Sequence, residues 1–166
     1  DGFIEKIKKQ KVKTKSEEWN LNSKKSLLYF WLNEDVEVIK PQTYMNKSGS
    51  AVKDVASAHP ELSTQDILVI HDDWSFPLGE FKLQFDKGAN RHNGVQHIID
   101  TLGTREFWRL RIGIGGESDS RQDQSASDYV LSQFTRQEKE SLSFLISSEI
   151  VPEIENWINA AVSCKL

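Results

Sequence analysis

A set of polar side chains suited to acid–base chemistry stands beside apolar segments in the middle of the chain. Asp72 and Asp73 end the apolar run "ILVIHDD", and His92 and Asn93 open the apolar segment "HNGVQHII". A carboxylate at the end of a buried strand can orient a histidine as a general base. An amide such as Asn46, in "TYMNKSG", can bind a carbonyl or a developing oxyanion. The residue types are those of a site for acid–base chemistry.

Each of these side chains also has an ordinary structural interpretation. Asn46 and Asn93 stand at the starts of predicted helices, where an Asn oxygen commonly caps the first turn. One of Asp72 and Asp73 can form a turn while the other faces solvent, and His92 can be a surface histidine. Taken singly, the structural interpretation is favoured for the amides and His92 and is evenly matched for the aspartates. Their occurrence together at element termini favours a site.

A metal centre formed by His71, Asp72 and His92 is a third interpretation, because imidazole and carboxylate groups are common metal ligands. These residues lack a recognised ligand spacing, and the one cysteine, Cys164, cannot form an intrachain disulfide. The sequence has no P-loop, no G-x-S-x-G, and no G-x-G-x-x-G before a helix. We therefore expect neither a metal nor a cofactor.

Predicted strands and helices alternate around these residues. Strands are expected at 26–32, 36–40, 66–73, 81–85 and 107–116, and helices at 2–10, 49–59, 93–102 and 136–162, the last broken near Pro152. The alternation predicts an α/β fold: one domain with a twisted mixed β-sheet flanked by helices. The run at 66–73 is apolar enough to predict a central strand with both faces covered.

Length and composition describe an ordinary globular domain. The 166 residues, 37% hydrophobic and 28% charged, fit one domain with a proper core. No stretch approaches the roughly 18 apolar residues of a membrane span, and no signal peptide is recognisable, so we expect a cytoplasmic protein without a membrane partner. The net charge of -4 argues against indiscriminate nucleic-acid binding. Lysines crowd the N-terminus and leave a local basic patch open: Lys6, Lys8, Lys9, Lys11, Lys13 and Lys15.

Four longer segments resemble bacterial-type peptidyl-tRNA hydrolase in their order and spacing. They are "KPQTYMNKSGSAV", "ILVIHDDWSFPLGEFKL", "RHNGVQHIIDTLGTREFWRLRIGIGG" and "DYVLSQF". The resemblance runs from about residue 36 to 134 and is weaker at both ends. It implies a metal-free monomer that hydrolyses the ester between a peptide and the terminal ribose of tRNA, and therefore a tRNA-binding protein of translation.

The resemblance also implies a role for each matching polar residue. Asn46 would hold the substrate near the scissile ester. Asp72 would orient and polarise the catalytic histidine. Asn93, beside His92, would help to place the attacking water and the tRNA 3′ end.

The same resemblance indicates how substrate is held. Tyr44 and Met45 would line the cleft beside the site. Basic side chains near the cleft would contact tRNA phosphates and make binding weak and steeply salt-dependent. The candidates are Lys87, Arg91, Arg105 and Arg109.

Two departures from the family pattern stand out. The family's catalytic histidine lies in a "G-N-P-G…R-H-N-x-G-F" segment, and none of His59, His71, His92 and His97 occupies that place. We therefore expect residues 1–166 to lack the first strand and catalytic-His loop and to be inactive alone. The alternative is a non-catalytic RNA-binding relative that uses the same cleft. The second departure is the loop "DKGANRHNG", which replaces a glycine-rich run with bulkier residues and leaves its backbone path open.

Overall fold

The computed structural model describes residues 19–22, 24, 27–32, 35–115 and 133–163. The predicted helix at 2–10, the lysines before residue 16 and most of the loop at 115–127 lie outside these ranges. In chain order the elements are β1 (Asn20–Leu21), β2 (Leu27–Trp31), β3 (Glu37–Pro41), η1 (Met45–Lys47), α2 (Ser48–Ala58), η2 (Thr64–Asp66), β4 (Leu68–Pro77), β5 (Phe81–Phe85), α3 (Asn93–Leu102), β6 (Trp108–Gly115), α5 (Arg136–Leu145), η4 (Ile146–Ile150) and α6 (Val151–Ser163).

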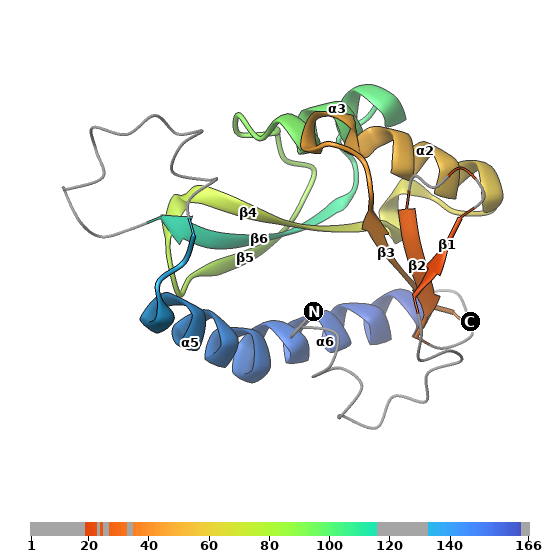
Figure 1. Ribbon diagram of the computed structural model, residues 1–166. Helices are drawn as coiled ribbons and strands as arrows, with labels where there is room; N and C mark the ends of the chain where they lie inside the picture. Colours follow the sequence, from red (N-terminus) through yellow and green to blue (C-terminus); the bar gives the residue numbers. More distant parts are fainter. Residues whose placement is uncertain (1–18, 23, 25–26, 33–34, 116–132, 164–166) are drawn as a thin grey trace.

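The described strands form two three-stranded sheets, β1-β2-β3 and β4-β6-β5. The first sheet is antiparallel; in the second, β4 runs parallel to β6 and β5 antiparallel to it. Figure 1 shows the mixed sheet between two helical layers, α2 and α3 on one side and α5 with α6 on the other. The predicted α/β fold with a mixed sheet and flanking helices is confirmed, with the strands divided between two sheets.

Strand β4 carries the polar residues of interest and differs from expectation in its position. Its apolar run predicted a central strand, yet among the described strands β4 lies at one edge of the order β4-β6-β5. Ile70 accordingly keeps 43% of its surface exposed. An apolar run reports how much of a strand can be buried, but it does not report which strands pair with it.

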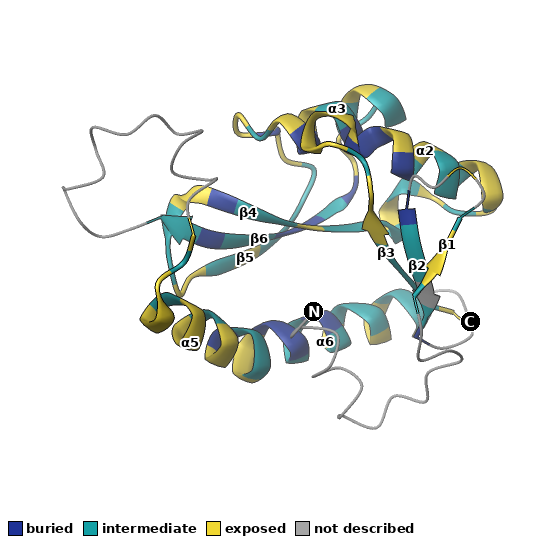
Figure 2. Cartoon of the chain, viewed as in Figure 1, coloured by how far each residue is buried: buried dark blue, intermediate teal, exposed yellow. Residues whose placement is uncertain are grey.

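Two apolar cores hold the helical layers to the mixed sheet (Figure 2). Under α3, Val95 and Ile98 pack with Phe107. On the opposite face, Leu110 packs with helix residues that include Leu145. Phe107, directly before β6, and Leu110, within it, thus contribute to opposite layers. The position of α3 over the sheet is therefore fixed by side chains that contribute no chemistry.

The C-terminal helical layer bends where a break near Pro152 was predicted. The helix continues through a π-helical turn, η4, into α6. Proline lacks a backbone N–H and so leaves an upstream carbonyl without its usual donor, a common setting for a π-turn. Hydroxyl groups of Ser147 and Ser148 donate to the carbonyl oxygen of Phe144 at 2.9 Å and stabilise the bend.

The predicted hairpin is confirmed as β2 and β3, whose register runs from Leu27 opposite Pro41 to Trp31 opposite Glu37. Leu32, directly after β2, packs against Val151 of α6 and joins this sheet to the C-terminal helix. Among the helices that the structure describes, none combines the length and the apolar character needed to cross a membrane.

Candidate active site

The turn η1 lies against the start of α3 because Gly94 has no side chain. A Cβ atom at Gly94 would lie 2.8 Å from Sδ of Met45 and 3.0 Å from its carbonyl oxygen. The same atom would lie 3.1 Å from Cε1 of His92. The backbone N–H of Gly49 strengthens the contact by donating to Nδ1 of His97, at 2.9 Å. Two segments distant in sequence, 44–46 and 92–94, are thereby brought together.

His92 joins α3 to the middle of β4 through its two ring nitrogens, because β4 continues past the predicted end at residue 73 to Pro77. Nδ1 accepts a hydrogen bond from the backbone N–H of Val95 at 3.2 Å and caps the helix. The neutral ring therefore carries its proton on Nε2. Nε2 lies 3.4 Å from Oδ1 of Asp72, a long hydrogen bond. This bond lowers the pKa of Asp72, which keeps the carboxylate ionised at neutral pH.

His71 forms a cluster with Asp72 and His92. Its Nδ1 lies 2.7 Å from the backbone carbonyl oxygen of Asp72 and donates to it. Its ring meets the His92 ring edge to face, with centroids 4.8 Å apart and an interplanar angle of 68°. Burial lowers the pKa of His71 to about 4, so the ring is neutral. In the part of the chain described, its buried Nε2 has no hydrogen-bond partner.

Asp73 is a structural carboxylate, which separates the roles of the two neighbouring aspartates. It is 4% exposed and accepts hydrogen bonds from Nε and Nη2 of Arg111 at 2.9 and 2.6 Å. The backbone N–H of Ser75 donates to it at 2.9 Å, and Asn90 approaches it at 3.4 Å. The sequence showed Arg111 as one residue of an alternating strand, but pairing across strands has no local signal.

The amides expected to cap helices do not do so. Asn46 lies in η1 and is exposed, and no hydrogen bond of its side chain to another described residue is found. The residue before α2 is Lys47, whose side chain makes no capping bond. Asn93 is the first residue of α3 and is exposed, while His92 provides the cap. The capping interpretation is wrong for both amides, which remain available to a ligand.

The two residues expected to line the cleft are strongly exposed. Tyr44 is 82% and Met45 is 54% exposed, although Met45 also touches the start of α3 through its sulfur. Apolar side chains left exposed beside a polar cluster are typical of binding surfaces.

The predicted phosphate contacts divide into accessible and inaccessible residues. Lys87 and Arg91 are exposed, and the Arg105 side chain, 61% exposed, pairs with Asp86 at 2.7 Å. Arg109 is 1% exposed and donates from Nη1 to the carbonyl oxygen of Gly88 at 2.9 Å. The expectation for Arg109 is wrong, because strand alternation directs it under the loop that precedes α3 rather than toward solvent.

The loop between β5 and α3 contains backbone conformations that favour glycine. Asp86, Asn90 and Arg91 have φ angles of 50°, 48° and 64°, in the left-handed region. Asn tolerates this region comparatively well, whereas Arg is strained there. The bulkier residues of "DKGANRHNG" are thus accommodated by backbone conformations that a glycine-rich run adopts freely.

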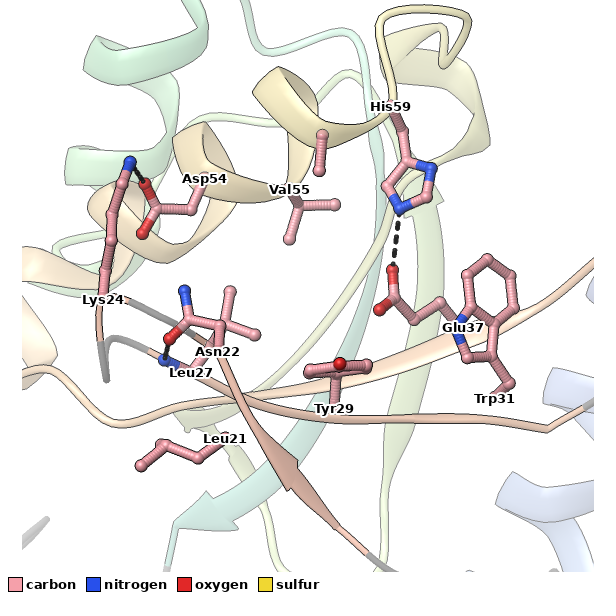
Figure 3. A pocket seen from close by; sticks show the side chains of 11 residues that line it. Leu21, Asn22, Lys24, Leu27, Tyr29, Trp31, Glu37, Asp54, Val55 and His59 are labelled. Atoms are coloured by element: carbon pink, nitrogen blue, oxygen red, sulfur yellow. Dashed lines mark hydrogen bonds and ion pairs between the residues drawn. The ribbon is translucent and has the colours of Figure 1, made fainter. Parts of the chain in front are cut away.

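A separate pocket of about 380 Å³ lies between the antiparallel sheet and α2 (Figure 3). Nε2 of His59 lies 3.3 Å from the Glu37 carboxylate, and the His59 ring meets the edge of Trp31. Burial raises the pKa of Glu37, although His59 opposes the change. None of the predicted site residues lines this pocket. Within the described ranges, no three His, Cys, Asp or Glu side chains gather as metal ligands.

A carboxylate bonded to an imidazole, with two exposed amides nearby on an α/β scaffold, has the residue types that hydrolases use. A sequence model of the peptidyl-tRNA hydrolase family matches residues 3–164. A peptidyl-tRNA hydrolase of Thermodesulfovibrio yellowstonii is 42% identical over 132 residues, covering 79% of this chain and 68% of the relative. One of Sulfurihydrogenibium sp. is 45% identical over 105 residues, covering 63% and 53%.

The structural comparison agrees. The crystal structure of peptidyl-tRNA hydrolase from Acinetobacter baumannii has a TM-score of 0.69 and 27% identity, covering 95% of this chain and 83% of that chain. The chain belongs to the peptidyl-tRNA hydrolase family. It spans between about half and two thirds of the length of these two curated relatives.

Proposed function

We propose that this protein hydrolyses the ester bond of peptidyl-tRNA and so returns tRNA to translation. The observation that carries the proposal is the contact between Asp72 and His92, 3.4 Å long, beside the exposed amides of Asn46 and Asn93. Ester hydrolysis needs an activated water, a base tuned by a carboxylate, and donors for the tetrahedral oxyanion. Family membership supports the ester of peptidyl-tRNA as the substrate.

The hydrogen bonds restrict what His92 can do. Its Nδ1 lone pair accepts from Val95, and its Nε2 carries a proton, so the ring has no free lone pair with which to accept a proton. His92 is therefore not the base, and its one N–H is directed at the Asp72 carboxylate. Asp72 uses Oδ1 toward His92, which leaves Oδ2 to orient a separate base. Asn93 would place the attacking water, and Asn46 would bind the carbonyl oxygen.

The tRNA would be held by side chains around the same site. Tyr44 and Met45 offer exposed apolar surface to the substrate. Contacts of Lys87, Arg91 and Arg105 with phosphates would make binding steeply salt-dependent, and the net charge of -4 would keep it weak. We further propose that the protein is a monomer and acts in the cytoplasm.

The test measures both hydrolysis and binding of a labelled peptidyl-tRNA. It is run on residues 1–166 and on the protein as encoded by its gene. The proposal predicts rapid cleavage of the bound peptidyl-tRNA by the gene product. Binding without cleavage by the gene product would instead support the non-catalytic RNA-binding relative.

A further inference from the structure

We propose that His71 is a positioning residue that, as a neutral ring, holds both members of the Asp72–His92 pair in place. The inference rests on the proposed function for its consequence in catalysis, but its structural part stands on contacts alone. His71 touches one partner through a backbone hydrogen bond and the other through its ring.

The first contact determines the direction of the Asp72 backbone. Nδ1 of His71 donates to the carbonyl oxygen of the next residue at 2.7 Å, a short bond for a neutral donor. The register of β4 against β6 becomes irregular directly after Asp73, so the ladder alone gives the strand little support there. The bond from His71 supplies that support at the residue whose carboxylate must reach His92.

The second contact restricts the His92 ring. The two rings meet edge to face at 4.8 Å, an arrangement that aromatic pairs prefer. The bond from His92 to Asp72 is long, at 3.4 Å, and by itself holds Nε2 only weakly. The His71 ring packs against the His92 ring and helps to keep Nε2 directed at the carboxylate.

Neutrality of His71 is part of this role. The titratable groups facing it are Asp72 and Asp73 of β4 and His92 of α3. A proton on Nε2 would be buried without an acceptor among the described residues and would lie beside the His92 ring. Such a charge would repel any positive charge on His92 and compete for Asp72. Burial prevents this, so the hydrogen bond from His92 to Asp72 is not challenged by a charged His71.

The experiment follows the His92 ring nitrogens by ¹⁵N NMR in three variants. His71→Ala removes both contacts, His71→Phe keeps the ring, and His71→Asn keeps a donor near the Nδ1 position. We expect the single Nε2-protonated form of His92 to give way to averaged tautomers in His71→Ala, with partial restoration in the other two. His59→Ala, in the separate pocket, is the matched control and leaves the His92 signals unchanged.

Kinetics provide a second readout. In the gene product, His71→Ala should lower kcat about 10- to 100-fold with KM changed less than about 2-fold. His71→Phe and His71→Asn, whose folding is checked by circular dichroism, decide the outcome if His71→Ala does not fold. Wild-type His92 signals in every folded variant would overturn the inference. Altered His92 signals in a protein that never cleaves peptidyl-tRNA would leave the inference standing and defeat the proposed function.

Discussion

The Asp72 carboxylate, in the middle of β4, lies 3.4 Å from Nε2 of His92, the residue directly before α3. The next residue, Asp73, turns the other way and binds Arg111 at 2.6 Å. Strand alternation explains the division, because successive side chains point to opposite faces. One carboxylate is thereby available for chemistry while its neighbour holds the sheet together, so substitutions of the two should have different effects.

Asp72→Asn should abolish most of the activity with little loss of stability. The amide keeps the size of the side chain but removes the charge that would orient a base, a contribution of about 10²- to 10⁴-fold in general acid–base catalysis. The measurement is single-turnover hydrolysis of peptidyl-tRNA by the gene product. Asp100→Asn, on the exposed side of α3, is the matched control and should change the rate less than about 2-fold. Equal rates for the two variants would remove Asp72 from the mechanism.

Asp73→Asn should instead destabilise the fold. Breaking a buried ion pair by neutralising one partner typically costs about 3–5 kcal/mol, and the Asp73 side chain is 3% exposed. Denaturant unfolding checks the value, with Glu140→Gln as the control, because its pair with Arg136 is exposed and contributes about 0.5 kcal/mol or less. A loss below about 1 kcal/mol for Asp73→Asn would contradict the assignment.

The Asp73 carboxylate should also make the free energy of unfolding depend on pH in acid. Burial would raise the pKa of Asp73, but hydrogen bonds from Ser75 and Arg111 outweigh it and hold the pKa at about 2, below the usual 3.8. The unfolded chain therefore takes up this proton first as pH falls. The stabilisation is complete above about pH 4 and is lost between pH 4 and 2. Unfolding titrations of wild type and Asp73→Asn in that range measure the difference.

His71 should give a second pH dependence at higher pH. Its pKa falls from 6.5 to about 4, mainly through burial, so the unfolded chain binds more protons than the folded chain between these values. The free energy of unfolding should rise from pH 4 to 6.5 and then level off. His71→Phe cannot titrate and should flatten this rise. An unchanged slope in the variant would show that other groups produce it.

Gly94→Ala should separate η1 from α3. The added carbon would lie 3.0 Å from a backbone oxygen of Met45 and 2.8 Å from its sulfur, and overpacking of this kind costs about 1–3 kcal/mol. We expect weaker substrate binding as well, since Met45 and Asn46 move away from His92. Gly88→Ala is the control, because no atom lies within 4 Å of its added carbon. Thermal unfolding and the KM for peptidyl-tRNA distinguish the two variants.

Arg91→Gly should weaken tRNA binding without destabilising the fold. Glycine adopts the observed φ of 64° without strain, so the free energy of unfolding should stay constant or rise by up to about 1 kcal/mol. Loss of a phosphate contact should reduce the slope of log affinity against log salt by about 0.7 to 0.9. Filter binding at several salt concentrations gives the slope. Lys53→Gly, on the exposed face of α2, should leave the slope unaltered.

Local patterns predicted the elements well. Apolar alternation in β5 and β6 and helical spacing in α3 correspond to the structure, as does Gly103 at the end of α3 with a φ of 70°. The hairpin β2–β3 was equally evident from its turn. These features depend on neighbours in sequence, which is the information that such patterns carry.

The local patterns did not predict contacts between segments that are distant in sequence. The edge position of β4, the pairing of Asp73 with Arg111 and the burial of Arg109 depend on which segments meet in space. The cap of α3 is instructive, because Asn93 is the better capping type but His92 does the capping. Capping propensity ranks residue types, but the backbone path into α3 decides which residue occupies the N-cap position.

His92 caps α3 with one nitrogen and meets Asp72 with the other, so loss of its side chain has two effects at once. A slow His92→Ala enzyme would combine a frayed helix with a missing donor, and its rate could not be assigned to either. Replacement by Asn, a good N-cap, would retain the helix start while shortening the reach to Asp72. A replacement at position 92 must therefore satisfy helix initiation and the contact with Asp72 together.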